Sequence, residues 1–443
     1  MSFEIIPFRN SEDVLSCIPE IYKTNLQWFT ITPKFTTVRV NTLKYNAENV
    51  AESIRRTLYK ESSILGCKLQ PEVFVHHTIR DCVVIGSWDS FYVPNLNKCG
   101  EVIIDVPCGN AVLRGANIFA PGVLSLSPKT REGEIVEIYV DLRGKCRRGY
   151  IKNFCGDKIY IGSGIAKMNR NMLFANNAKL NGVAVEVIYR ISNVPSINIQ
   201  YDCGLLQNLP SIICSYTLEL SSDSEVLDMC ASPGNKTTHI AILMENMGRI
   251  VALDKNLQKV AKIMSLSSSF GLTNIFAYIW DSTKAVTDDS SQTNEGPPFK
   301  TSTFNRILLD APCSALGHRP NLYNKITLRQ LKSYVSLQRK LFHNAVELLK
   351  PGGILVYSTC TITVEENEGM VKWALNKYSD LKLSKSEPLF GLPGLEESGL
   401  SEEERSMVQR FGLAPGNTPE MDTIGFFIAK FVKDNKNNTC LYL

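Results

Sequence analysis

Val226-Leu-Asp-Met-Cys-Ala-Ser-Pro-Gly-Asn-Lys-Thr-Thr238 lies near the middle of a chain of 443 residues. Its apolar beginning predicts a strand, Pro233 and Gly234 predict a tight turn, and the two threonines begin a helix. A phosphate-binding P-loop needs G-x-x-x-x-G-K-[ST], but Met229 replaces the first glycine and Asn235 separates Gly234 from the lysine. The dinucleotide motif G-x-G-x-x-G is absent as well. The turn therefore indicates a ligand that the backbone approaches closely and that has no pyrophosphate group.

The sequence on both sides of this turn alternates between strand and helix patterns. Apolar runs predict strands at 225–228, 249–254, 274–279, 306–310 and 353–357, with an amphipathic helix over 327–349. This alternation predicts an α/β fold with a doubly wound, Rossmann-like sheet whose ligands lie at the carboxyl ends of the strands. The polar stretch 284–303 is expected to be a loop, and the Gly-, Glu-, Ser- and Pro-rich stretch 385–420 a mobile flap before a last strand at 424–431.

Acidic residues follow the second and third of these strands, at Asp254 and Asp281. A carboxylate at the end of the second strand can accept hydrogen bonds from a ribose diol, and one after the third can reach an adenine amino group. These groups suit a nucleoside without phosphates, such as S-adenosylmethionine. The alternative is that each aspartate only caps a following helix. The candidate cofactor-binding residues are Cys230, Ala231, Ser232, Pro233, Gly234, Asn235, Lys236, Asp254, Asp281 and Asp310.

Two cysteines follow the fourth and fifth strands, in Asp310-Ala-Pro-Cys313-Ser and Tyr357-Ser-Thr-Cys360-Thr. Both sulfurs are expected above the same sheet edge as the cofactor. Cytosine C5 is a poor nucleophile, so its methylation needs a thiolate that adds to C6, while Asp310 stabilises the charge on the ring. A second thiol can assist release of the product. A Cys-His hydrolase, with His318 as the base, is the competing use of these residues.

Residues 101–190 differ from this pattern, because short β-branched runs separated by Gly, Asn and Pro predict a small β-barrel. Segment 141–170 within it holds eight basic and two acidic residues. Such a cluster, interleaved with aromatic residues, suits an RNA backbone; the alternative is a solvated turn. The candidate RNA-binding residues are Arg147, Arg148, Lys152 and Arg170.

The whole chain has a formal charge of only +4, so nucleic-acid affinity must come from a local patch. None of the 13 cysteines forms a C-x-x-C pair, and we expect no metal site. The N-terminus has no export signal and no run of 18 apolar residues occurs, which predicts a cytoplasmic protein that does not span a membrane. With no heptad pattern, we expect a monomer.

These motifs resemble those of the NSun-type RNA cytosine-5 methyltransferases, as do Arg39-Val-Asn-Thr-Leu-Lys44, Gln207-Asn-Leu-Pro-Ser211 and Glu366-Asn-Glu. The stretch Cys108–Gly122 resembles a PUA domain, an RNA-binding barrel, and its insertion at this place is typical of the sixth branch of that family. The resemblance covers almost the whole chain. It implies an N-terminal α/β segment (1–100), a PUA-like domain (101–190) and a catalytic domain (191–443).

The resemblance also implies roles for the two cysteines: Cys360 is the nucleophile and Cys313 promotes product release. The substrate it implies is transfer RNA, methylated near the 3′ end of the acceptor stem with the CCA end held by the PUA domain, and messenger-RNA hairpins as a further substrate. Asn235 departs from the usual glycine, and we expect it to adopt left-handed geometry at some cost. Ser314-Ala-Leu-Gly317 replaces the usual Ser-Gly-x-Gly, and Tyr323-Asn-Lys replaces an aromatic residue beyond it.

Two other functions remain open at this point. The first is an RNA-binding protein with an inactive methyltransferase fold, which Asn235 and the basic segment would suit. The second is DNA methylation by the same chemistry, which the PUA-like barrel disfavours.

Overall fold

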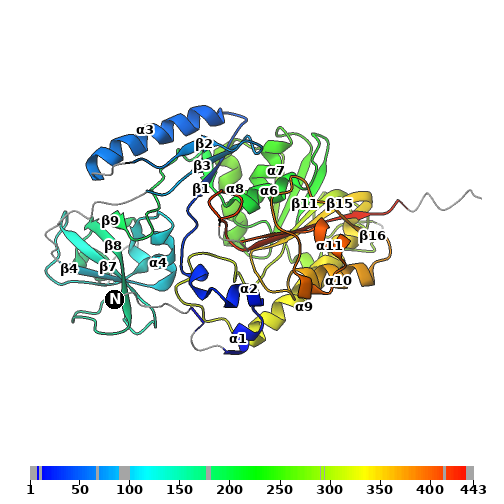
Figure 1. The fold of residues 1–443 in the computed structure, drawn as a ribbon. Helices are drawn as coiled ribbons and strands as arrows, with labels where there is room; N and C mark the ends of the chain where they lie inside the picture. Colours follow the sequence, from blue (N-terminus) through cyan, green and yellow to red (C-terminus); the bar gives the residue numbers. More distant parts are fainter. Residues whose placement is uncertain are drawn as a thin grey trace, which may run out of the picture.

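The computed structural model describes residues 7–8, 12–65, 69–88, 100–175, 181–289, 291–293, 295–412 and 416–435. They form three sheets, each with its own helices (Figure 1). Among the described residues, no helix combines the length and apolar character needed to cross a membrane.

The largest sheet has eight strands, and it confirms the predicted doubly wound fold. Its order is β13-β12-β11-β14-β15-β18-β16, with β16 (Leu381–Ser384) at one edge and β17 (Gln409–Phe411) paired to β18. Strands β11 (Glu225–Asp228), β12 (Arg249–Asp254), β13 (Ile275–Ile279), β14 (Phe304–Asp310) and β15 (Leu349–Thr359) are parallel, and β18 (Phe426–Lys433) is antiparallel to β15. Because the order reverses between β11 and β14, a crevice opens at the carboxyl ends of these two strands.

Helices cover both faces of this sheet, as crossover connections between parallel strands require. They are α6 (Leu209–Tyr216), α7 (Asn235–Leu243), α8 (Leu257–Phe270), α9 (Leu328–Leu348) and α10 (Glu368–Lys377). Two large apolar clusters result, one centred on Leu227, Phe342 and Tyr357 and the other on Val226, Ile240 and Val356. Adjacent residues of β11 thus point into opposite clusters, as expected for a strand buried on both faces.

The second sheet has six strands and accounts for the predicted barrel runs. Its order is β5-β9-β8-β7-β4-β6. Its strands are β4 (Gly100–Ile104), β5 (Ile118–Phe119), β6 (Val123–Leu126), β7 (Ile135–Asp141), β8 (Lys158–Ala166) and β9 (Val183–Arg190), accompanied by α4 (Val106–Leu113) and α5 (Arg170–Phe174). The sheet has an apolar core of its own, so it is a separate packing unit.

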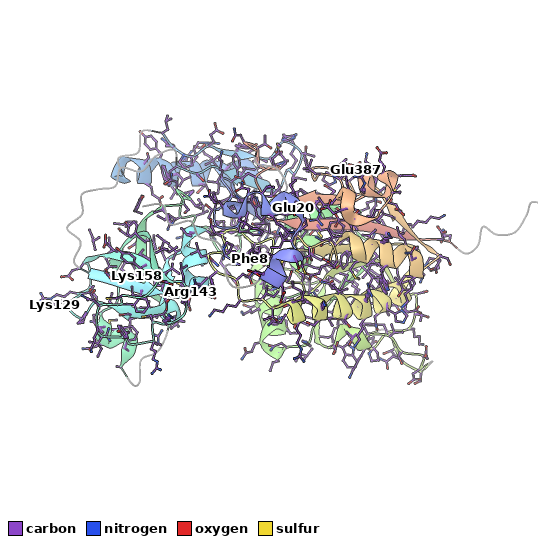
Figure 2. The ribbon with its side chains drawn as sticks, turned by 60° about the horizontal axis from the view of Figure 1, so that its bottom comes forward. Phe8, Glu20, Lys129, Arg143, Lys158 and Glu387 are labelled. Carbon is purple, nitrogen blue, oxygen red and sulfur yellow. The ribbon has the colours of Figure 1, made fainter. Side chains whose placement is uncertain are left out.

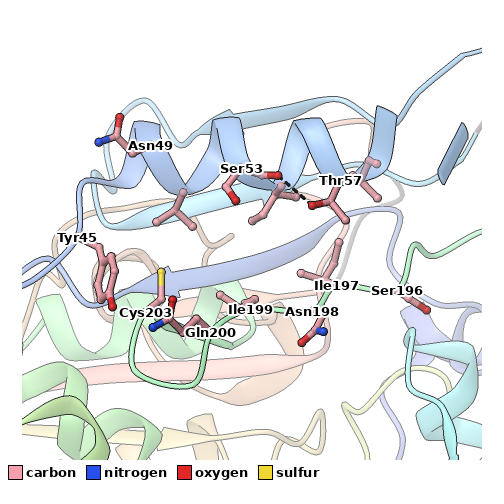
Figure 3. A pocket seen from close by; sticks show the side chains of 13 residues that line it. Tyr45, Asn49, Ser53, Thr57, Ser196, Ile197, Asn198, Ile199, Gln200 and Cys203 are labelled. Atoms are coloured by element: carbon pink, nitrogen blue, oxygen red, sulfur yellow. Dashed lines mark hydrogen bonds between the residues drawn. The ribbon is translucent and has the colours of Figure 1, made fainter. Parts of the chain in front are cut away.

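The third sheet joins residues from both sides of the six-stranded unit. Strand β10 (Gly204–Leu206) pairs with β1 (Thr36–Val40), which pairs with β3 (Cys82–Ile85) and then β2 (Val73–Val75). Helix α3 (Ala47–Leu65) packs on this sheet, and a pocket lies between α3 and residues 196–203 (Figure 3). The short helices α1 (Glu12–Ser16) and α2 (Glu20–Lys23) precede β1. The chain therefore leaves the sheet, forms the six-stranded unit and returns.

Buried polar contacts attach this third sheet to the eight-stranded one. The Arg39 guanidinium on β1 donates to the Gln207 amide oxygen at 2.9 Å and to the Thr238 hydroxyl on α7 at 2.9 Å. Asp81 lies 2.8 Å from His239, also on α7. Helix α7, which follows the glycine turn, is thereby held from the side of the N-terminal sheet.

The predicted mobile flap at 385–420 is wrong for the part that the structure describes. Helix α11 (Glu402–Met407) and strand β17 (Gln409–Phe411) fold back onto β18. Arg410 is 1% exposed and pairs with Glu368 on α10, which is 0% exposed. The polar composition of the segment reflects these internal contacts.

Candidate active site

The glycine turn forms at the carboxyl end of β11, as predicted. Gly234 caps α7 with a φ of +106°, and an added Cβ would lie 3.2 Å from the Ile263 Cα. Both the positive φ and this close approach require glycine. Asn235 is the first residue of α7 and lies outside the positive-φ residues, so the expectation of left-handed geometry there is wrong. An asparagine at this position therefore imposes no backbone strain on the turn.

A pocket of about 270 Å³ lies beside the turn and brings together residues from five strand ends. Half of the predicted cofactor-binding residues line it, together with both predicted thiols: Cys230, Ser232, Asp254, Asp281, Asp310, Cys313 and Cys360. The remaining candidates, Ala231, Pro233, Gly234, Asn235 and Lys236, form the turn behind this lining. The residues predicted for a nucleoside site and the two predicted thiols thus line one pocket.

The two acids at the strand ends both make cap-like hydrogen bonds and still line the pocket. Asp281 Oδ1 accepts from the Thr283 backbone N–H at 3.0 Å, and Asp254 Oδ1 accepts from the Asn256 N–H at 3.2 Å. The capping role considered as an alternative is therefore real for Asp281, which begins a 3₁₀ turn. The second oxygen of Asp254 lies 3.5 Å from the Lys259 Nζ, and both hydrogen bonds of Asp281 go to its Oδ1. These acceptor oxygens suit ribose hydroxyls and an exocyclic amine better than phosphate.

Cys313 and Cys360 meet in this pocket, with their sulfurs 3.4 Å apart. The hydrogen bond from the Cys313 thiol lowers the pKa of Cys360 well below its usual range; burial opposes this, and the charge and hydrogen bond of the His318 imidazole add to it. The same bond, together with burial, raises the pKa of Cys313. These opposite shifts favour the thiolate at Cys360 and the thiol at Cys313.

Asp310 lies at the end of β14 and forms a partly buried ion pair with Lys236. Its Oδ2 is 2.7 Å from the Lys236 Nζ, and its Oδ1 accepts from the Ser358 hydroxyl at 2.8 Å. Burial alone would lower the pKa of Lys236, but the attraction of Asp310 outweighs it and raises that pKa. The pair presents a carboxylate at the pocket wall with a permanent positive charge directly behind it.

Glu366 holds the loop that carries Cys313, a role that its motif did not reveal. Its carboxylate accepts from the Ser314 backbone N–H at 3.0 Å, the Ser314 hydroxyl at 2.6 Å and the Gln338 amide at 3.0 Å. The residue is 1% exposed, and burial raises its pKa. Five polar groups converge on it when the hydroxyls of Thr363, at 3.0 Å, and Thr361, at 3.4 Å, are included. This network fixes the position of Cys313 relative to Cys360.

The predicted RNA-binding residues lie on the six-stranded unit, and they differ in the hydrogen bonds that their side chains make within the protein. Arg148 donates to the carbonyl oxygens of Ala120, Pro121 and Val123, and Arg170 to those of Leu126 and Tyr150. Arg147, Arg148 and Lys152 are all exposed. Figure 2 shows two further basic residues of the segment on this unit: Arg143, paired with Asp157, and Lys158, paired with Glu101. Arg147 and Lys152 thus differ from Arg148 and Arg170 in that their charged groups do not take part in these backbone hydrogen bonds.

One cluster elsewhere has the residue types of a metal site: His76, His77 and Glu420. The His76 Nδ1 accepts hydrogen bonds from the backbone N–H groups of Thr78 and Ile79. Its Nε2 must then carry the proton, and it faces the Glu420 carboxylate at 3.0 Å. This tautomer suits a histidine–glutamate contact and leaves no lone pair at Nε2 for a metal ion.

Comparisons with known proteins agree with this geometry. Residues 215–432 match the family model "16S rRNA methyltransferase RsmB/F", and residues 100–186 match the PUA domain. The chain is 40% identical to the Homo sapiens tRNA (cytosine(72)-C(5))-methyltransferase NSUN6, over 93% of this chain and 91% of that protein. It is 34% identical to a tRNA (cytosine(72)-C(5))-methyltransferase of Pyrococcus horikoshii, over 76% of each.

Among solved structures, the crystal structure of NSun6 from Pyrococcus horikoshii with SFG is similar to this chain. The TM-score is 0.68 at 28% identity, and the match covers 93% of each chain. The likeness extends over the six-stranded unit as well as the catalytic sheet. The PUA assignment of that unit is thereby confirmed.

Proposed function

The chain belongs to the NSun-type family of RNA (cytosine-C5) methyltransferases, and we propose that it methylates a cytosine near the 3′ acceptor end of transfer RNA through a covalent Cys360–C6 intermediate. The observation that carries the proposal is the contact of the two sulfurs, 3.4 Å apart, in a pocket that Asp254 and Asp281 also line. Messenger-RNA hairpins with a similar end are a second substrate within the proposal.

S-adenosylmethionine is the proposed cofactor, and when bound it supplies an electrophilic methyl group to the pyrimidine. Asp254 and Asp281 would hold its ribose and adenine groups, with Cys230 and Ser232 against the nucleoside. The glycine turn brings the backbone of β11 to the same pocket. This assignment is supported by the absence of both phosphate-binding motifs from the turn.

Cys360 begins the reaction as a thiolate that adds to C6 of the cytosine. This addition places negative charge on the ring, and the Asp310–Lys236 pair lies at the pocket wall to meet it. Asp310 can accept a hydrogen bond from the exocyclic amine and so orient the base, and the Lys236 ammonium offsets the negative charge on the ring. The base must leave its stack to reach this pocket, as in other enzymes that modify nucleobases.

Cys313 acts in the second half of the reaction. Its thiol holds the shared proton only while Cys360 is a thiolate. Once the Cys360 sulfur is bound to carbon, that negative charge is gone and the pKa of Cys313 falls. Cys313 can then lose its proton to solvent and, as a thiolate, take the C5 proton; the C5–H electron pair re-forms the C5=C6 bond, and the C6–S bond breaks with its electron pair returning to the Cys360 sulfur. The raised and lowered pKa values of the pair support this order of events.

The PUA domain supports RNA as the substrate. We place the acceptor and CCA end against this domain, with Arg147 and Lys152 toward the phosphates and with Arg148 and Arg170 shaping the loops that carry them.

The chain acts as a monomer in the cytoplasm within this proposal. A reducing compartment is supported by the described cysteines, all of which are free thiols.

The test is methyl transfer from labelled S-adenosylmethionine to a tRNA transcript, read by bisulfite sequencing. The wild-type protein should label an acceptor-end cytosine, Cys360→Ala should not, and Cys313→Ala should accumulate a protein–RNA adduct stable in denaturing gels. Cys155→Ala, which removes an exposed cysteine of the PUA domain, is the control and should behave as wild type.

Full activity of Cys360→Ala would contradict the nucleophile assignment, and freely released product from Cys313→Ala would contradict the release role. RNA binding with no methylation of any transcript would favour the inactive fold. That alternative is weaker now that Asn235 lies in an ordinary helical position. Equal labelling of a matched DNA hairpin would argue against RNA specificity.

A further inference from the structure

The stretch that leads into and forms most of helix α9 is strongly basic. Residues 312–346 contain six lysine and arginine residues and no aspartate or glutamate. Two of these cations are used within the protein: Arg319 pairs with Asp422 at 2.7 Å, and the Arg339 guanidinium lies 5.3 Å from the centroid of the Trp373 ring. The other four are exposed: Lys325, Arg329, Lys332 and Lys340.

Three of these exposed cations lie on one face of α9. Arg329, Lys332 and Lys340 are spaced so that they project from the side of the helix opposite the buried Leu331 and Gln338. Among the residues that the structure describes, no carboxylate lies within ion-pair distance of these three side chains. We call these three residues the α9 face.

The charges of the α9 face do not stabilise the helix. Arg329 is the second residue of α9, where the positive end of the helix dipole disfavours a cation, and the first turn has no acidic residue to offset it. Helix α1, whose Val14 shares an apolar cluster with Leu331, carries Glu12 and Asp13, and in the described part of the chain neither forms an ion pair with α9. A cation placed against a local rule in this way indicates a negatively charged partner.

The loop before α9 is docked on the PUA domain. The Arg143 guanidinium lies 5.4 Å from the centroid of the Tyr323 ring, and the Leu322 N–H donates to Asn110 Oδ1 at 3.2 Å. The Leu322 side chain is part of the apolar core of the PUA domain. The α9 face therefore begins next to the basic segment 141–170.

The same helix reaches the pocket that holds the two predicted thiols. Leu337 and Leu341 of α9 line this pocket together with both sulfurs. Arg329 lies eight residues before Leu337, which is about 12 Å along the helix axis, and Lys340 directly precedes Leu341. The α9 face thus spans the distance between the PUA domain and the thiols.

We propose that the α9 face binds the phosphate backbone of the paired acceptor stem and holds it beside the thiol pocket. Lysine and arginine on a helix face neutralise phosphates without reading the sequence. RNA is favoured over an acidic protein because the face is continuous with the PUA domain at one end and with the pocket at the other. The inference rests on transfer RNA being the substrate of the proposed function, and it adds a second RNA surface, on the catalytic part.

The test compares two RNAs in a salt series, without cofactor. One is a tRNA acceptor hairpin with its single-stranded CCA end, and the other is a single-stranded oligonucleotide with the same end. Binding to the full-length protein is measured by fluorescence anisotropy. Arg329→Gln/Lys332→Gln/Lys340→Gln should reduce the slope of log Kd against log salt by about 2–3 for the hairpin, because three phosphates are no longer neutralised. The slope for the oligonucleotide should not change.

Two matched variants serve as controls. Arg329→Lys/Lys332→Arg/Lys340→Arg preserves the three charges and should keep the wild-type slope. A second variant, Lys372→Gln/Lys377→Gln/Lys382→Gln, removes three exposed charges from α10 and β16 and should also keep it. Helix α10 lies on the side of the molecule away from the PUA domain (Figure 1). Glutamine is a good helix former, so thermal melts should show that both glutamine variants are folded.

An unchanged hairpin slope in the glutamine variant of the α9 face would overturn the proposal. So would an equal reduction for both RNAs, since the face would then contact the single-stranded end, and so would an equal reduction in the Lys372 variant, which would indicate a general charge effect. If the hairpin slope changes as expected but the wild-type protein methylates no tRNA, the α9 surface stands and the proposed substrate fails.

Discussion

Asp228, the last residue of β11, is buried below the glycine turn and receives a hydrogen bond from the Thr237 hydroxyl at 2.7 Å. Burial raises its pKa from 3.8 to about 7, so the folded state holds a proton that the unfolded chain gives up near pH 4. The free energy of unfolding must therefore decrease as the pH rises from about 4 to 7, by up to about 4 kcal/mol. Asp228→Asn should remove this decrease.

Urea unfolding at pH 5 and pH 8 checks this expectation. The wild-type protein should lose stability between the two values, and Asp228→Asn should lose much less. Asp223→Asn, at an exposed acid before the same strand, should keep the wild-type dependence. An identical pH dependence in wild type and Asp228→Asn would show that Asp228 is ionised in the folded protein.

Ala315 lies two residues after Cys313, where the family usually has glycine, and it has a φ of +55°. A side chain in this left-handed region costs about 1–2 kcal/mol, whereas glycine pays only for its greater freedom in the unfolded chain. Ala315→Gly should therefore stabilise the protein by about 0.5–1 kcal/mol, measured by urea unfolding. Ala116→Gly, at a position outside the left-handed region, should destabilise it. Loss of stability in Ala315→Gly would mean that its methyl group makes favourable contacts.

At the scale of helices and strands, the sequence predicted those elements that a local pattern of apolar residues determines. Each of the five parallel strands lies where an apolar run predicted it, and the four inner ones are apolar because both of their faces are largely buried, whereas β13 at the edge is partly exposed. Pairing between distant segments could not be predicted in this way. β1 pairs with β10 across the inserted unit, and Lys236 forms an ion pair with Asp310. No local periodic pattern in the sequence predicts either contact.

The segment before the last strand shows why composition alone is misleading. Arg410 on β17 donates to both carboxylate oxygens of Glu368, at 2.8 and 2.5 Å, and to the Ile362 carbonyl at 2.7 Å. Arg410→Met would leave the Glu368 charge buried without a partner and should cost about 3–5 kcal/mol of unfolding free energy. The double variant Arg410→Met/Glu368→Met should recover much of this loss.

Chemical denaturation of the three proteins tests the role of the pair. The control is Lys382→Ala on the neighbouring strand β16, which breaks an exposed ion pair between Lys382 and Asp434. It should change the free energy of unfolding by less than about 1 kcal/mol. If Arg410→Met were as mild as this control, β17 would not depend on the pair, and the interpretation of the segment as a flap would return.

At the scale of the whole molecule, the basic surface and the catalytic pocket belong to different packing units. A pocket of about 560 Å³ lies between these units, lined by Arg114 and Phe119 of the PUA domain, Thr37 and Leu206 of the N-terminal sheet, and Arg319 near the thiols. Because the insertion leaves from and returns to one small sheet, the PUA domain is held beside the catalytic part at both of its ends. An RNA held by its backbone on the PUA domain could extend along this junction toward Cys360.

The basic segment 141–170 leads to the last prediction: Arg148 donates to backbone carbonyl oxygens and Arg147 does not, so the two exposed arginines should behave differently. Each phosphate that is no longer neutralised should reduce the slope of log Kd against log salt by about 0.7–0.9. Arg147→Ala/Lys152→Ala should therefore flatten the slope for a tRNA acceptor hairpin by about 1–2 without changing stability. Arg148→Ala should instead lower the melting temperature, because its guanidinium holds the carbonyls of Ala120 and Val123. The control is Lys129→Ala, at an exposed lysine outside the segment, which should change neither the salt slope nor the melting temperature. An unchanged slope in the double variant would identify the segment as a solvated turn.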